Sequence, residues 1–369
     1  MSPPRKILMT TDAIGGVWTY ALDLAAGLAP FGVETTLAVL GPSPARDQVR
    51  EAEMVAGLTL IETGLPLDWI AEEPAAIGET AAAVRGLARE RKADLVHLNS
   101  PALAAGGFPV PVLGVCHSCL ATWWSEVKDG PMPPDFVWRT QALWRGLLAC
   151  DALAAPTASF AAATARAYEV PTPFVVQNGR RSGARPNTLR EPLVFTSGRL
   201  WDEGKNVRVL DQAAGLIASP AYAAGPLASP SGGELDLAHL TALGRLSAAE
   251  IDNWLSRASI YASSALYEPF GLGVLEAAQA GCALVLSDIP TFRELWDGAA
   301  LLVDPADPRA YAAAFDRLLR DEAQARRLGA LAKTRARRFT VEAMTRGVLD
   351  IYAHLAGALA PPRRWEAVA

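Results

Sequence analysis

The stretch that decides the fold is ALYEPFGLGVLEAAQAGCALVLSD, residues 265–288. A proline directly follows Glu268, which disfavours helical geometry at the glutamate and places it in a loop. A helix is expected to begin near Gly271 and Gly273, with Glu276 lying roughly 7–8 Å along its axis. The apolar run that closes the stretch predicts a buried strand. The stretch therefore predicts a loop, a helix and a strand, with two carboxylates near one junction.

The remainder of the chain repeats this alternation of short apolar runs and amphipathic stretches, which is typical of βα units around a parallel sheet. Strands are expected near residues 6–10, 35–40, 94–98, 111–116, 152–156, 173–177, 192–200, 221–225, 240–244, 259–263, 283–287 and 300–303. Helices are expected near residues 17–29, 74–91, 138–149, 158–168, 205–218, 247–256, 271–280, 308–319 and 340–358.

The 369 residues exceed one ordinary domain and fit two. A segment rich in arginine, proline and glycine begins at residue 178 and lacks apolar periodicity, so it predicts the domain boundary. The fold class is α/β, with two doubly wound, Rossmann-like domains facing across a cleft, because open parallel sheets bind ligands at the carboxyl ends of their strands. We expect an N-terminal domain at 1–180, a linker at 181–192, a C-terminal domain at 193–350, and a tail at 351–369 that either packs back on the first domain or frays.

Composition excludes several classes of protein. The net charge of −5 and the lack of a sustained basic stripe argue against a nucleic-acid partner. No apolar run is long enough for a signal peptide or a spanning helix, which predicts a cytoplasmic protein. The C-x-x-C pattern of Cys116 and Cys119 has neither a thioredoxin-like setting nor further zinc ligands, so we expect ordinary reduced thiols and no metal.

The two glutamates suit one elongated ligand. Free N–H groups and the dipole at the start of the helix near Gly271 favour a phosphate group. A carboxylate on either side, Glu268 before and Glu276 beyond, accepts hydrogen bonds from hydroxyl groups, and neighbouring ribose hydroxyls match such a grip. A ligand with hydroxyls, a pyrophosphate and a ribose is a sugar nucleotide. The alternative is a capping acid at the turn and a solvent-exposed Glu276.

The same stretch resembles the E-x7-E signature of retaining glycosyltransferases of the GT-B fold, of the family 4 (glycosyl transferases group 1) type. The resemblance runs almost element by element through residues 240–308 and is looser in the first half. It implies that Glu268 contacts the hydroxyls of the donor sugar and stabilises its developing charge, and that Glu276 holds the ribose hydroxyls. The backbone of three residues would face the donor sugar and phosphate: Phe270, Gly271 and Leu272.

Arg199 and Lys205, in TSGRLWDEGKN, follow a predicted strand at the same sheet edge. Two cations there can neutralise a diphosphate as negative charge grows on the leaving group. The alternative is a surface ion network with Asp202 and Glu203. The resemblance favours the first interpretation, because similar Arg and Lys residues bind the donor pyrophosphate in the family.

Two further features lie after strands of the first half. Gly15 and Gly16 form a turn between the first strand and the first helix, without the G-x-G-x-x-G pattern of dinucleotide sites. The family has a similar glycine loop near the donor phosphates and the acceptor. His117 follows a strand at its carboxyl end, and a histidine at a matching place in the family contacts the donor sugar; the alternative is a structural histidine.

The resemblance also implies that the backbone at Arg245 and Leu246 lies against the nucleotide base, and it matches Asn178 to an NG turn that ends the first domain. Asn178 can equally be a turn former. Trp123, Trp124 and Asn178 are candidates for the acceptor side, where aromatic rings stack on sugars. The alternative role of the two tryptophans is packing of a helix and its loop.

The resemblance thus implies a retaining, metal-independent hexosyltransferase without a cofactor. It would move a sugar from a nucleotide-diphosphate sugar, with UDP-sugar favoured and GDP-mannose next, to a sugar, glycan or lipid-linked acceptor, and it leaves peripheral membrane contact open. Three alternatives remain: a sugar-nucleotide epimerase on the same fold, a catalytically silent nucleotide-sugar-binding protein, and a NAD-dependent oxidoreductase, against which the missing glycine fingerprint counts.

Overall fold

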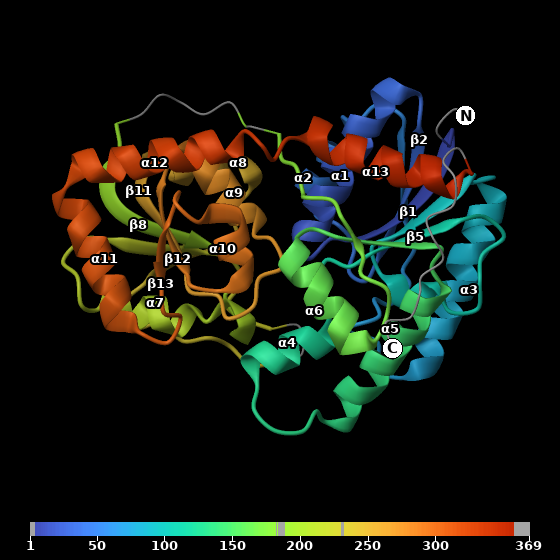
Figure 1. Ribbon diagram of the computed structural model, residues 1–369, viewed down its shortest axis with the longest axis horizontal. Coiled ribbons are helices and arrows are strands. Elements are labelled where there is room, and N and C mark those ends of the chain that lie inside the picture. Colours follow the sequence, from blue (N-terminus) through green and yellow to red (C-terminus); the bar gives the residue numbers. More distant parts are fainter. Residues whose placement is uncertain (1–3, 182, 184–188, 230–231, 358–369) are drawn as a thin grey trace. The chain divides into compact units, whose positions relative to one another are not determined.

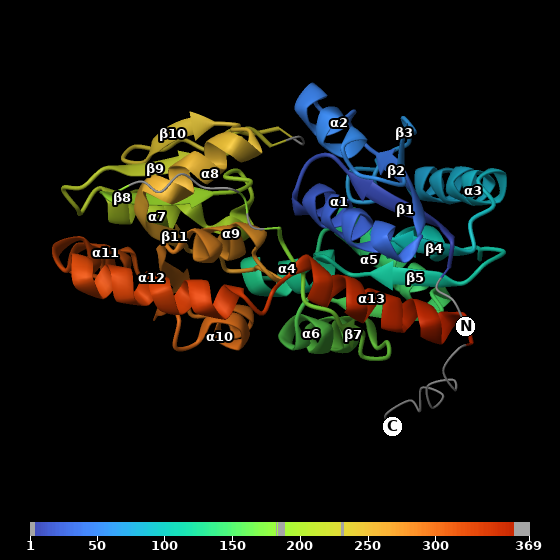
Figure 2. The same cartoon turned by 90° about the horizontal axis from the view of Figure 1, so that it is seen from above.

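The computed structural model describes residues 4–181, 183, 189–229 and 232–357 (Figure 1). Half of the predicted linker (182 and 184–188) and residues 358–369 of the predicted tail lie outside this part of the chain. The chain forms two compact units, and each is an α/β body with a parallel sheet between helices (Figures 1 and 2). The chain passes from the first unit to the second between Gly179 and Arg180, and returns between Thr340 and Val341.

The first unit contains a seven-stranded parallel sheet in the order β3-β2-β1-β4-β5-β6-β7. Its strands are β1 (Lys6–Asp12), β2 (Glu34–Leu40), β3 (Leu58–Glu62), β4 (Leu95–Leu98), β5 (Val112–Val115), β6 (Ala152–Ala155) and β7 (Phe174–Val175). The central strands are buried over almost their whole length, as expected for a sheet covered on both faces.

Helices cover both faces of this sheet. They are α1 (Gly16–Leu28), α2 (Arg46–Glu53), α3 (Pro74–Glu90), α4 (Leu120–Val127), α5 (Pro134–Ala149), α6 (Ala158–Tyr168) and α13 (Val341–Leu355), with short 3₁₀ turns η1 (Ala29–Phe31) and η2 (Pro101–Ala104). One core includes residues of α1 and α13, and another includes residues of α3 and η2. Helices α1 and α13 run side by side (Figures 1 and 2). Gly27 permits this close approach, because a Cβ there would lie 2.0 Å from the Thr345 hydroxyl oxygen.

The second unit contains a six-stranded parallel sheet in the order β10-β9-β8-β11-β12-β13. Its strands are β8 (Glu191–Ser197), β9 (Ala221–Ala224), β10 (Thr241–Gly244), β11 (Ala258–Ser263), β12 (Ala283–Ser287) and β13 (Leu301–Val303). Its helices are η3 (Glu203–Lys205), α7 (Val207–Ala214), α8 (Ala248–Arg257), α9 (Leu272–Ala280), α10 (Pro290–Trp296), α11 (Pro308–Arg320) and α12 (Glu322–Ala336). One core includes α8, α9 and α10, and the other includes α7 and α11.

Several elements depart from the sequence-based expectations. β3, α2, α4, α10 and α12 were not predicted. β3 is an edge strand with no fully buried residue, and α2 is polar with one buried residue, so neither carries a strong apolar signal.

The C-terminal boundary expected at residue 350 is wrong, since it falls inside α13, which packs as a whole against α1 in the first unit. β8 already begins at Glu191, two residues before the expected domain start. Among the described residues, no helix combines the length and apolar character needed to cross a bilayer.

Candidate active site

Strand order identifies the point in the second sheet where a ligand is expected. From β8 the chain moves to β9 on one side, whereas β11 leads to β12 on the other, so the direction of winding reverses between β8 and β11. Open α/β sheets bind ligands outside the carboxyl ends of the strands at such a switch point. Arg199 follows β8 by two residues and Glu268 follows β11 by five, so both lie on loops that leave this point.

Lys205 and Glu268 form an ion pair at this edge, with Nζ 2.5 Å from Oε2. The two side chains are 24% and 14% exposed, so the pair is largely screened from solvent. The backbone also ties the two loops together, since the amides of Leu266 and Tyr267 both donate to the Gly204 carbonyl. The structure therefore brings two predicted catalytic residues into contact although 63 residues separate them.

Asn206 and Ser264 fix the backbone behind this pair. Asn206 adopts a left-handed conformation (φ 52°), in which its amide group donates to the carbonyls of Ser264 and Pro305 at 3.0 and 2.8 Å. The Ser264 side chain is fully buried, and its hydroxyl donates back to the Asn206 carbonyl at 2.8 Å. These reciprocal bonds hold the end of η3, and with it Lys205, against the β11 loop.

Arg199 lies beside the same loop. Its Nη2 donates to Asp202 Oδ2 at 2.9 Å, and its guanidinium lies 5.7 Å from the centre of the Trp201 ring. The other carboxylate oxygen of Asp202 accepts from the Gly204 amide at 2.9 Å and caps η3. The ion pair predicted as an alternative for Arg199 is thus present, and it orders the loop on which Lys205 also lies.

Glu276 is the fifth residue of α9, as the sequence predicts, and it is not a solvent-exposed helix residue. Its side chain is 18% exposed, and Oε1 accepts a hydrogen bond from Arg180 Nε at 2.7 Å. Arg180 was not predicted as a site residue, because it lies in the arginine-rich segment that begins at residue 178 and predicts the domain boundary. The alternative interpretation, in which Glu276 is exposed to solvent, is therefore wrong.

The start of α9 presents its backbone, while its larger side chains turn into the core. Gly271 is the N-cap with φ 88°, a conformation that favours glycine, and Phe270 is buried in the core. Gly273 leaves room for Tyr261, because a Cβ there would lie 2.7 Å from the tyrosine hydroxyl. Burial raises the pKa of Tyr261, and the nearby charges of Glu276 and Glu268 raise it further. Both carboxylates thus act on the same buried hydroxyl.

Arg245 and Leu246 follow β10, at the same carboxyl edge of the sheet. Arg245 is exposed, and Leu246 packs partly against the core that contains α9. The next residue, Ser247, caps α8 with Glu250. The segment at Arg245 and Leu246 therefore places its backbone and one long cationic side chain at the edge of the sheet where the nucleotide base is expected.

The first unit has an equivalent switch point between β1 and β4. Asp12 ends β1, and its Oδ1 accepts hydrogen bonds from the amides of Ile14 and Gly15 at 2.8 and 3.1 Å. This turn delivers Gly15 as the N-cap of α1 and exposes Gly16 as its first residue. Asp12 was not predicted, because it closes an apolar run and resembles a strand end.

His117 follows β5 and hydrogen-bonds to Asn99, with Nε2 2.8 Å from Oδ1. The amide nitrogen of Asn99 donates to the Thr10 carbonyl at 2.7 Å, which fixes the amide orientation. Asn99 Oδ1 must then accept, so His117 carries its proton on Nε2 and keeps Nδ1 as an acceptor. Burial lowers the pKa of His117 to about 3, which keeps the ring neutral.

A network of buried side chains connects His117 to α13. The Tyr20 ring meets the His117 ring edge-on at 4.5 Å, and the Tyr20 hydroxyl lies 3.4 Å from His97 Nε2. His97 Nδ1 lies 2.7 Å from the hydroxyl of Tyr352, on α13. Burial, and then the nearby His117, lower the pKa of His97 to about 3. The C-terminal helix is thereby connected to the candidate residue His117.

These two histidines predict a loss of stability in acid. Their pKa values in the folded protein, about 3, lie below the value of about 6.5 expected for the unfolded chain. As pH falls below about 6.5 the unfolded chain binds more protons, so each histidine should lower the free energy of unfolding by about 1.4 kcal/mol per pH unit down to about pH 3. Denaturant unfolding at several pH values gives the slope of the free energy of unfolding against pH. For His97→Gln this slope should be smaller than for the wild type, by the equivalent of about one proton. An unchanged slope would contradict this assignment.

Trp123 and Trp124 lie on α4 and form an aromatic cluster with Phe136. Trp123 stacks on Phe136 at 6.0 Å, and Trp124 meets it edge-on at 5.2 Å. Trp124 Nε1 donates to the Gly130 carbonyl at 3.0 Å. The packing role is therefore present for both rings, and each also keeps a partly exposed surface. Asn178 is buried beyond β7.

The thiols of the C-x-x-C pattern are both buried. Burial raises the pKa of Cys116 and Cys119, and the Cys119 sulfur lies 2.8 Å from the Thr122 hydroxyl. A buried thiol with a raised pKa forms little thiolate, which disfavours redox chemistry at this pair.

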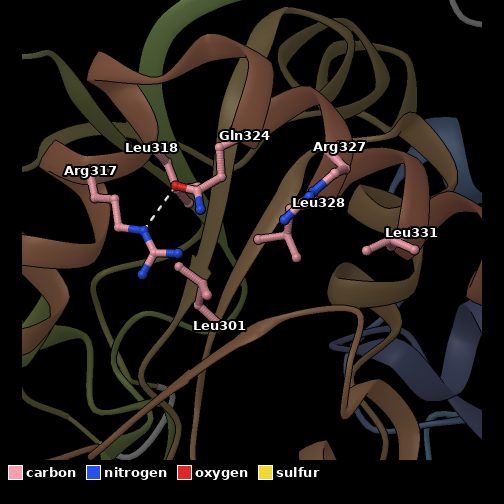
Figure 3. Close-up of a pocket in the computed structure, with 7 residues that line it drawn as sticks. All are labelled: Leu301, Arg317, Leu318, Gln324, Arg327, Leu328 and Leu331. Atoms are coloured by element: carbon pink, nitrogen blue, oxygen red, sulfur yellow. Dashed lines mark hydrogen bonds between the residues drawn. The ribbon is translucent and has the colours of Figure 1, made fainter.

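A pocket of about 90 Å³ lies elsewhere in the second unit, between β13, α11 and α12 (Figure 3). Arg317 Nε donates across it to Gln324 Oε1 at 2.9 Å. Its lining residues are Leu301, Arg317, Leu318, Gln324, Arg327, Leu328 and Leu331. None of the predicted site residues is among them.

Comparison with known families agrees with this geometry. The family described as Glycosyltransferase Family 4 matches residues 14–180, and the family described as Glycosyl transferases group 1 matches residues 233–335. The chain thus contains a domain of each of these two glycosyltransferase families. The second match spans Glu268 and Glu276, and the first spans His117.

Solved structures show that this glycosyltransferase family member has the GT-B fold. Sucrose-phosphate synthase from Thermosynechococcus elongatus aligns with a TM-score of 0.78 over 96% of this chain and 100% of that chain, at 19% identity. HepE from Anabaena in complex with UDP-glucose aligns with a TM-score of 0.70 over 96% and 100% of the two chains, at 17% identity.

A curated relative shares more sequence over a shorter stretch. D-inositol 3-phosphate glycosyltransferase from Frankia alni is 39% identical over 107 residues, 28% of this chain and 26% of the relative. The aligned stretch therefore spans about a quarter of the length of the curated relatives that this family member matches.

Proposed function

We propose that this protein is a retaining glycosyltransferase that moves a sugar from a nucleotide-diphosphate sugar to an acceptor hydroxyl. The observation that carries the proposal is the Lys205–Glu268 ion pair, held at the switch point of the second sheet on the loop that leads into α9. A cation for phosphate and a carboxylate for sugar hydroxyls thus stand side by side.

In the proposed reaction, the bond between the anomeric carbon and the β-phosphate oxygen breaks, and a bond to the acceptor oxygen forms on the same face of the sugar. The leaving phosphate takes the proton of the acceptor hydroxyl. Arg199, Lys205 and the N–H groups at the start of α9 stabilise the negative charge on that phosphate. Glu268 stabilises the positive charge that develops on the sugar, and Glu276 binds the ribose hydroxyls.

We propose that no divalent metal takes part, because these cations and the helix terminus supply the positive charge that a metal would otherwise provide. The proposed donor is a UDP-sugar, with GDP-mannose next. The complex of the structural neighbour HepE with UDP-glucose supports the first choice. The proposed acceptor is a sugar, glycan or lipid-linked hydroxyl bound by the first unit, with Trp123 and Trp124 as candidates on the acceptor side. His117, Gly15 and Gly16 are proposed to contact the donor. The proposed setting is the cytoplasm, where thiols stay reduced.

Thermal unfolding with UDP, GDP, ADP, their common sugar derivatives and NAD tests the donor site. A ligand at a hundred times its dissociation constant should stabilise the protein by about 2.7 kcal/mol. We expect one nucleotide family to raise the melting temperature, EDTA to leave the shift unchanged, and Glu276→Ala to remove it. A shift with NAD alone, or none with any sugar nucleotide, would contradict the proposal, and a shift abolished by EDTA would contradict metal independence.

A further inference from the structure

Arg180 lies where the chain first enters the second unit. Its backbone amide donates to the carbonyl of Phe339 at 3.3 Å, one residue before the end of that unit at Thr340. The two connections between the units therefore meet side by side within the second unit, and this hydrogen bond joins them.

The side chain and carbonyl of Arg180 are both bound to α9. Nε donates to Glu276 Oε1 at 2.7 Å, and the Arg180 carbonyl accepts from Gln279 Nε2 at 2.9 Å. Glu276 and Gln279 are three residues apart and so share one face of the helix. The side chains of Arg180 and Glu276 are only 16% and 18% exposed, which makes this a largely buried, charge-assisted hydrogen bond.

Phe339 contacts the other end of the same motif. Its ring meets the Phe270 ring edge-on at 5.7 Å and lies 5.5 Å from Trp296. Phe270 belongs to the loop between Glu268 and α9. The residues at the two connections thus hold both parts of the E-x7-E motif, Phe339 at the loop and Arg180 at the helix.

We propose that Arg180 is a positioning residue that orients the Glu276 carboxylate to bind the ribose hydroxyls of the donor. This inference rests on the proposed function, since it assigns a partner to the ribose-binding group. The described bond engages Oε1 from one side and leaves Oε2 to accept a ribose hydroxyl. Without the guanidinium, a carboxylate at this depth lacks its counter-charge and turns toward solvent.

The opposite role for Arg180 makes an opposite prediction. If the guanidinium occupied the place of the ribose, its removal would free Glu276 and tighten nucleotide binding. If Arg180 only stabilised the fold, its removal would lower the melting temperature and leave the preference for ribose unchanged. Ligands that differ in one ribose hydroxyl separate the three cases.

The experiment is calorimetric titration of the full chain with UDP and 2′-deoxy-UDP, and with GDP and 2′-deoxy-GDP. In the wild type we expect the ribose form to bind about tenfold or more tightly than the deoxy form, from one hydrogen bond to a charged group. Arg180→Gln should weaken UDP binding by a similar factor and bring the ratio between the two ligands close to one. Arg180→Lys should restore part of the preference for the ribose form.

Arg181→Gln is the matched control, because it makes the same change at the next, exposed residue. It should leave both dissociation constants and their ratio unchanged. The ratio compares two ligands on one protein, so partial destabilisation of a variant does not alter it. Tighter binding by Arg180→Gln, or a ratio equal to that of the wild type, would overturn the assignment. A wild type that binds no nucleotide would instead overturn the proposed function, and with it this inference.

Discussion

Glu268→Gln is expected to lower the turnover number for sugar transfer by about 10²–10³-fold, the usual effect of removing one group that stabilises transition-state charge. The substitution keeps the size of the side chain and one acceptor oxygen, but it removes the negative charge that Lys205 contacts. Because charge develops on the sugar only as the bond to phosphate breaks, the loss should appear in kcat. The Kd for the free nucleoside diphosphate, which lacks the transferred sugar, should stay within a few fold of the wild type.

Glu79→Gln provides the matched control, since it makes the same change on the exposed face of α3. Steady-state rates and nucleotide titrations of both variants, with thermal unfolding to check folding, separate the effects. A Glu268→Gln enzyme with near wild-type kcat would contradict the role of this carboxylate. So would a loss confined to nucleotide affinity.

Lys205→Met is expected to lower the transfer rate by a comparable factor of about 10²–10³, because it removes a cation from the leaving diphosphate. Unlike Glu268→Gln, it should also weaken the binding of UDP or GDP, since the diphosphate carries charge in the ground state as well. It leaves Glu268 without its counter-ion in a mostly buried position, so stability should fall by about 1–3 kcal/mol, less than for a fully buried pair.

The double variant Lys205→Met/Glu268→Gln tests the pair itself. If the two groups are coupled, the double variant should be more stable than Lys205→Met, because it no longer buries an unpaired carboxylate. Lys333→Met, on the exposed side of α12, controls for the loss of a lysine. Additive stability changes would show that the ion pair contributes no coupling free energy.

The sequence predicts the second sheet better than the first, for physical reasons. Strands β8 to β13 are short apolar runs that end in serine, glycine or a charged loop, so the residues after them are visible as candidates. Arg199, Glu268 and the fifth position of α9 could be placed in this way. β3 escaped prediction because an edge strand without buried residues lacks the apolar signal.

Other contacts could not be predicted, since they join residues distant in the chain. His97 and Tyr352 are 255 residues apart, and no local pattern indicates that α13 returns to the first sheet. A helix shows which of its faces is apolar but not which sheet will cover it, so the boundary at residue 350 was misplaced. Arg180 was not predicted for a related reason: within an arginine-rich segment, nothing in the composition distinguishes the arginine whose side chain binds Glu276.

The most direct test of the central claim follows a sugar nucleotide by NMR in the presence of the enzyme, EDTA and a panel of sugar and lipid-linked acceptors. The donor is the one that stabilises the protein most. We predict acceptor-dependent release of the nucleoside diphosphate, with the transferred sugar keeping the anomeric configuration that it had in the donor. An inverted product, an epimerised donor without diphosphate release, or an unchanged donor that nevertheless binds would contradict retaining sugar transfer at the Lys205–Glu268 site.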